Sequence, residues 1–175
     1  MSSTSAFGIK MIHPYVGIND SLEAGNYEYV KHTLEWWEKC WEWKKDGDYY
    51  ATRFNYYLNQ ALKSSMHITA ELPLYAHGTS VYTLQDTTEG KATGYMYLGY
   101  RIVDSLRLDS AIHYINLGIK RCPNRLDLYL GLASCYLYCD NHIDMIKTLE
   151  RAMRQSKKNK NQWLWSEEET PPAKD

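Results

Sequence analysis

Apolar and small side chains recur at helical spacing in residues 95–118. They fall three, four and seven positions apart, which places them on one face of a helix. The positions are Tyr95, Leu98, Gly99 and Ile102 in a first segment and Ala111, Ile115 and Gly118 in a second. The pattern predicts two helices joined by the connector SLRLDS, with Pro123 ending the second helix.

The segment that follows repeats this pattern at a shift of 34 residues. The first helix of each unit aligns Tyr95 with Tyr129, Leu98 with Leu132, Gly99 with Ala133, and Ile102 with Tyr136. The second helix aligns Ala111 with Met145, Ile115 with Leu149, and Gly118 with Ala152. A second helical pair is therefore predicted, with CDNH at residues 139–142 as its connector.

The repeat resembles the tetratricopeptide repeat (TPR) family, whose units have about 34 residues. Its signature is matched by Tyr95, Leu98, Gly99, Ala111 and Pro123, whereas Ile102, Ile115 and Met145 depart from it. The resemblance covers residues 92–159 as two repeats. It implies an all-α fold, in which antiparallel helical hairpins stack as a short right-handed array.

Two further helices are predicted before the repeats, at residues 22–45 and 48–65. Two repeats need a cover, because each unit buries its apolar face only against its neighbours. The first helix has two apolar stripes, which predicts contact with two neighbours. One stripe is Tyr27, Val30, Leu34, Trp37 and Trp41, and the other is Tyr29, Trp36, Cys40 and Trp43.

The chain is therefore divided into three parts. Residues 1–91 form a helical N-terminal part that packs on the repeats, and residues 67–91 within it form an irregular insert containing a loop and a short helix or hairpin. Residues 92–159 form the two repeats. Residues 160–175, which include Pro171 and Pro172, form a cap or a linker tail.

Composition narrows the classes of partner. Twenty Lys and Arg against 21 Asp and Glu give a net charge of -1, which offers no basic field for a phosphate backbone, so no nucleic acid is expected. No run of about 18 apolar residues occurs, so neither a membrane span nor a secretory signal is expected. We expect a cytoplasmic protein.

Candidate chemistry is sparse. Cys135, Cys139 and His142 have a spacing that could supply zinc ligands from a helix end, but no fourth ligand is evident, and the thiols are interpreted as small packing groups. The histidines are scattered and no glycine-rich phosphate loop occurs. We therefore expect no catalytic residues, no metal, no cofactor and no enzymatic activity.

The function predicted from this pattern is a scaffold that binds a peptide or protein segment in a groove along the first helix of each repeat. The predicted groove consists of Thr93, Met96, Tyr97, Tyr100, Val103, Asp127, Leu130, Ser134 and Tyr138. An alternative is a small-ligand-binding or enzymatic module, whose aromatic pocket is closed by residues 67–93. Self-association through exposed tryptophan is a further possibility.

Overall fold

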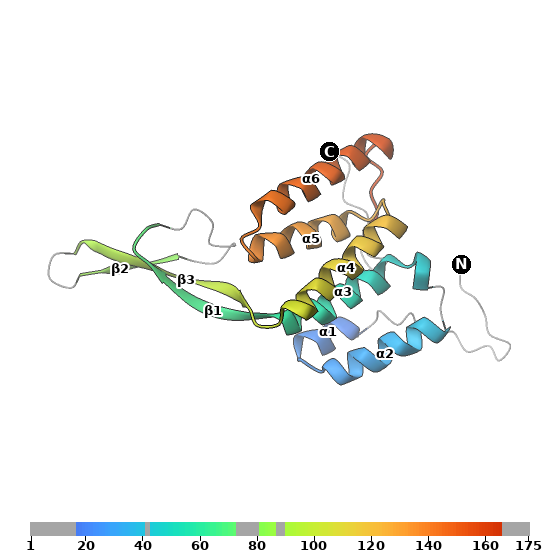
Figure 1. Cartoon of the computed structure of the whole chain (residues 1–175), viewed down its shortest axis with the longest axis horizontal. Helices are drawn as coiled ribbons and strands as arrows, with labels where there is room; N and C mark the ends of the chain where they lie inside the picture. Colours follow the sequence, from blue (N-terminus) through green and yellow to red (C-terminus); the bar gives the residue numbers. More distant parts are fainter. Residues whose placement is uncertain (1–16, 41–42, 73–80, 87–89, 166–175) are drawn as a thin grey trace.

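In the computed structural model, residues 17–40, 43–72, 81–86 and 90–165 are described. Helices flank a small sheet along the chain (Figure 1). The elements are α1 (Ile18–Glu23), α2 (Tyr27–Cys40), a 3-10 turn (Trp43–Lys45), α3 (Gly47–Ala61), β1 (Leu62–Thr69), β2 (Val81–Gln85), β3 (Ala92–Ile102), α4 (Ser105–Arg121), α5 (Leu126–Tyr138) and α6 (His142–Lys158).

The predicted all-α fold is wrong, because the chain contains an antiparallel sheet in the order β1-β3-β2. β3 pairs with β1 from Leu62 opposite Ile102 to Thr69 opposite Tyr95, and with β2 on its other side. The helix predicted over Tyr95 to Ile102 is therefore a strand. Its apolar residues also alternate at period two, so the segment suited a sheet as soon as two partner strands were present.

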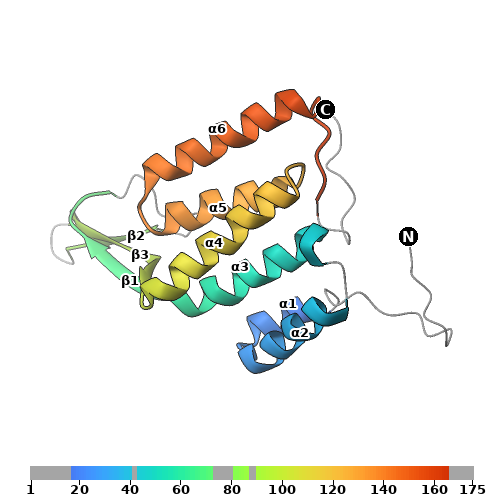
Figure 2. The ribbon, with the colours of Figure 1, turned by 45° about the vertical axis from the view of Figure 1, so that its right-hand side comes forward.

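The sheet leaves the helices as an arm, which consists of β1, β2 and β3 (Figures 1 and 2). β1 follows α3 directly, so α3 ends at Ala61 and not at residue 65 as predicted. The hairpin alternative considered for residues 67–91 agrees with β2, which pairs with the neighbouring β3. Residues 73–80 and 87–89 of that insert lie outside the described residues.

The helices α3, α4, α5 and α6 run alternately in opposite directions and lie side by side (Figures 1 and 2). α5 and α6 match the helical pair predicted for the second repeat, and their connector lies at residues 139–141. α4 matches the predicted second helix of the first repeat. The helix that pairs with α4 is α3, and the arm separates the two in sequence. Membership of the TPR family stays a prediction.

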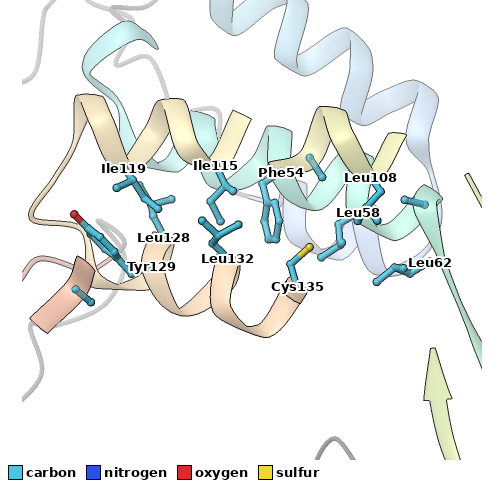
Figure 3. Close-up of a cluster of buried hydrophobic side chains, with 13 residues drawn as sticks. Phe54, Leu58, Leu62, Leu108, Ile115, Ile119, Leu128, Tyr129, Leu132 and Cys135 are labelled. Atoms are coloured by element: carbon cyan, nitrogen blue, oxygen red, sulfur yellow. The ribbon is translucent and has the colours of Figure 1, made fainter. Parts of the chain in front are cut away.

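The larger core lies between α3, α4 and α5. Phe54, Ile115 and Leu132 come from these three helices and point toward one another (Figure 3). Gly118 allows α4 to approach α3 closely, because a Cβ there would stand 2.7 Å from the Cβ of Tyr50. α6 covers α5 through a narrower face, on which Thr148 and Ala152 are buried.

A second core joins α1 and α2 to α3. Val30, Leu34 and Trp37 are buried, as predicted for the first stripe of the N-terminal helix. Tyr29 and Trp36 of the second stripe are exposed and do not face a neighbour as predicted. Trp43 of the same stripe lies in the 3-10 turn and packs against Tyr49, with ring centroids 4.8 Å apart. Trp41 lies outside the described residues, and so do residues 166–175 of the predicted tail.

Candidate binding cleft at the base of the arm

An open cleft of about 290 Å³ lies where the arm leaves the helices. Its size is near the lower end of the ~300–1,000 Å³ that small-molecule sites usually occupy, and it can accept one or two side chains. Its lining residues come from six elements, α1, α2, α3, β1, β3 and α5. Its lining is Leu22, Glu23, Tyr27, Leu58, Asn59, Leu62, Ser64, Tyr100 and Tyr138.

The base of the cleft is fixed by backbone hydrogen bonds at the change from helix to strand. The backbone of Leu62 is extended, yet its N–H still donates to the carbonyl of Leu58 in the last turn of α3. At the other end of the arm, the N–H of Val103 donates to the carbonyl of Ala61 (2.8 Å). Both ends of the arm are therefore held at one point, and Ser64 and Tyr100 enter the cleft from paired positions of β1 and β3.

Three tyrosine rings form much of the wall. Tyr100 of β3 contacts Tyr138 at the end of α5, with ring centroids 4.6 Å apart and planes inclined by 41°. Tyr27 packs edge-on against Tyr56, and its hydroxyl donates a long hydrogen bond to the carbonyl of Asn59 (3.5 Å). Such rings bind apolar groups with their faces and polar groups with their hydroxyls.

The lining is mostly uncharged. Glu23 is its charged residue, at the end of α1. Burial, with smaller contributions from Tyr100 and Cys135, raises the pKa of Tyr138. Its hydroxyl therefore remains protonated at neutral pH and can both donate and accept a hydrogen bond. The cleft suits an apolar group that carries nearby N–H donors or a positive charge.

The structure brings together two residues of the predicted groove, Tyr100 and Tyr138, which lie far apart in the sequence. Three others lie on α5 and lead toward this pair. Leu130 is exposed and Ser134 is partly buried, whereas Asp127 at the start of α5 forms an ion pair with Arg125. The α5 part of the predicted groove thus continues into the cleft.

The remaining predicted residues do not converge there, because β3 is a strand and its side chains alternate between two faces. Met96 shares the face of Tyr100 but lies farther out along the arm. Thr93 and Tyr97 are on the opposite face, where the Tyr97 ring stacks on the His67 ring with the centroids 5.2 Å apart. Val103 follows the strand and is exposed.

Sequence reasoning missed the other seven residues of the lining as site residues. Leu58 and Leu62 lie in the helix predicted at residues 48–65, and both belong to the larger core as well as to the lining of the cleft. Glu23 lies at the start of the helix predicted at residues 22–45, and Ser64 lies at the end of the helix predicted at residues 48–65. The one available signal was the alternation of polar and apolar residues from Leu62 to Thr69, which is typical of a strand.

Two of the three residues with possible zinc-ligand spacing, Cys135 and Cys139, pack in or against the larger core. Cys135 is fully buried in the larger core. Its pKa is raised mainly by a hydrogen bond with Cys139, and burial is the next cause. It is therefore a thiol and not a thiolate, the form that binds metals. Within the described ranges, no group of three metal-binding side chains gathers.

Among the described residues, no helix has the length and apolar character to cross a membrane.

No protein-family model matches this chain, and no significant match was found among curated proteins or among solved structures.

Proposed function

We propose that this protein is a helical-repeat scaffold that binds an extended segment of another protein. The binding site is the cleft at the base of the arm together with the exposed side of α5. The observation that carries the proposal is the contact of Tyr100 with Tyr138, which joins the cleft to a helix face.

The dimensions of this surface favour a peptide. From Leu130 to Tyr138, α5 advances about 12 Å at ~1.5 Å per residue, which equals about four residues of extended peptide. The cleft then accepts one bulky apolar side chain between the tyrosine rings and leucines. Anchoring one apolar residue in a pocket, with weaker contacts around it, is the usual energetic pattern of a protein interface.

The chemistry of the cleft also limits the anchor. Glu23 is unfavourable for an acidic residue at the anchor and favourable for Lys, Arg or a free amino group beside it. The preferred ligand is therefore a segment with a bulky apolar residue next to a cation. The small-ligand alternative has weaker support, because no described residue between 67 and 93 contributes to the lining of this cleft.

The experiment is a selection from a random peptide library against the full chain, followed by fluorescence anisotropy with one labelled selected peptide. We expect Tyr138→Ala to weaken binding at least about tenfold, the cost of an interface anchor. Tyr29→Ala is the matched control, because Tyr29 is an exposed tyrosine on α2 that is not part of the cleft lining. Circular dichroism verifies that each variant folds.

A second variant avoids the cavity that Tyr138→Ala leaves. Glu23→Arg changes the charge of an exposed residue at the rim, and it should weaken a peptide with a cation beside the anchor. If the selected peptide bound both variants as tightly as the original chain, the cleft would not be the binding site. Failure of the library to yield any binder of micromolar affinity would contradict the proposed function itself.

A further inference from the structure

The two faces of the arm differ in polarity. Directly paired residues of an antiparallel sheet lie on the same face, so the register assigns Met66, Ile68, Tyr82 and Leu98 to one face. We call this the apolar arm face, and it also includes Leu62, Ser64, Leu84, Gly94, Met96, Tyr100 and Ile102. None of these described residues is charged, whereas the opposite face carries Lys63, His67 and Arg101.

The outer half of the apolar arm face is open to solvent. The exposed fractions are 63% for Met66, 70% for Ile68, 59% for Tyr82 and 52% for Leu98. An antiparallel sheet that alternates in this way usually packs its apolar face against a core. Together these side chains expose on the order of 500 Å² of apolar surface. This area is near the upper limit for the largest apolar patch on a typical monomer.

We propose that the outer half of the apolar arm face, around Met66, Ile68, Tyr82 and Leu98, packs against the same region of a second copy of this chain, about a two-fold axis. Because the face carries no charge in its described residues, two copies can meet without placing like charges opposite one another. The two sheets would form a sandwich with a shared core. Burial of about 1,000 Å² in total is at the lower limit of specific interfaces, so the dimer should dissociate in the micromolar range.

A second copy could instead cover the apolar arm face with the exposed apolar side of its α6, which includes Ile143, Ile146 and Met153. Lys147 and Glu150 lie within one turn of these residues. Packing α6 on an uncharged sheet would remove both charges from water without providing new partners, which is costly. Apposition of two arm faces has no such penalty, so the second copy is expected to contribute its arm and not its α6.

Self-association is thus assigned to the apolar arm face and not to exposed tryptophan, which the sequence had suggested. Among the five described tryptophans, Trp37 is buried and Trp36 is exposed, and the other three, Trp43, Trp163 and Trp165, are partly buried. Trp36 is a single exposed ring on α2, whereas the apolar arm face gathers residues from three strands. The inference is independent of the proposed peptide binding, because the outer arm residues do not line the cleft.

The experiment is sedimentation equilibrium of the full chain from about 1 to about 300 µM, a range that brackets a micromolar dissociation constant. Tyr82→Asp and Thr83→Asp form a matched pair, since both replace exposed residues of β2 with the same charge on opposite faces. We expect a monomer–dimer equilibrium, weakened at least about tenfold by Tyr82→Asp and less than about threefold by Thr83→Asp.

A separate variant, Ile68→Asp, places the charge on β1 at the other edge of the sheet and should weaken the dimer to the same degree. It replaces Tyr82→Asp if circular dichroism shows that Tyr82→Asp disturbs the fold. A monomer at the highest concentration would overturn the proposal. So would a mass that grows beyond the dimer, as in a head-to-tail contact, or equal weakening by Tyr82→Asp and Thr83→Asp.

Discussion

Replacement of Arg125 should destabilise the fold more than replacement of any exposed arginine. The Arg125 guanidinium lies between α3 and α5 and is almost fully buried. Its Nη2 donates to Asp48 (2.6 Å) and to Asp127 (2.7 Å), and its Nε donates to Asp127 (2.8 Å). The Asp48 side chain is completely buried, so Arg125→Met would take away the Arg125 charge that pairs with this carboxylate in the protein interior.

The expected loss is about 3–5 kcal/mol of unfolding free energy, as for other buried pairs that lose one partner. With a urea dependence of about 2 kcal/mol per molar, the midpoint should fall by about 1.5–2.5 M. Methionine retains much of the side-chain volume, so the loss reports the charge and not a large cavity. Urea unfolding followed by circular dichroism at neutral pH measures it.

Two further variants test the reasoning. Arg154→Met breaks an exposed pair with Glu150 (3.4 Å) and should cost less than about 1 kcal/mol. The double variant Arg125→Met with Asp48→Leu removes both buried charges and should recover much of the lost stability. The interpretation fails if Arg125→Met costs no more than Arg154→Met, or if the double variant is no more stable than Arg125→Met alone.

Two more predictions concern acid stability and helix packing. Burial raises the pKa of Glu38, but hydrogen bonds from Tyr49 and Arg53 and the Arg53 charge outweigh it, so the net pKa is lowered. The stability that Glu38 contributes is therefore present above its unfolded pKa of about 4.3 and is lost as the pH falls through the folded value. Urea midpoints of the original chain and of Glu38→Gln should converge toward acid pH, whereas a constant difference would contradict this. Gly118→Ala should cost about 1–3 kcal/mol despite the better helix propensity of alanine, because its Cβ meets the Cβ of Tyr50 at 2.7 Å; an unchanged thermal midpoint would contradict the close approach of α3 and α4.

The sequence pattern was sufficient for helices whose apolar face has a long, uninterrupted helical period. The burial of Val30, Leu34 and Trp37 on α2 followed from that period. The hairpin of α5 and α6 followed from the same period together with the 34-residue repeat. Residues 95–102 could not be assigned in this way, because their apolar positions satisfy both the helical and the strand period. Pairing with β1 and β2 decides between the two, and this is a tertiary interaction.

The candidate site was harder to predict than the fold. Tyr138 was found because it lies on the exposed side of a correctly predicted helix. Tyr100 was included on the assumption of a helix, and it reaches Tyr138 from a strand. Glu23 and Ser64 join the site only where α1, α3 and the arm meet, and no local pattern in the sequence encodes that meeting point.

The central claim is that a peptide binds in the cleft at the base of the arm, and methyl NMR tests it most directly. The full chain, labelled at its leucine methyl groups, is titrated with the peptide selected from the library. The account predicts the largest shifts at Leu22, Leu58 and Leu62, which line the cleft, and unchanged signals at Leu34, which is buried in the second core. Binding of the peptide with no change at the three cleft leucines would contradict the account.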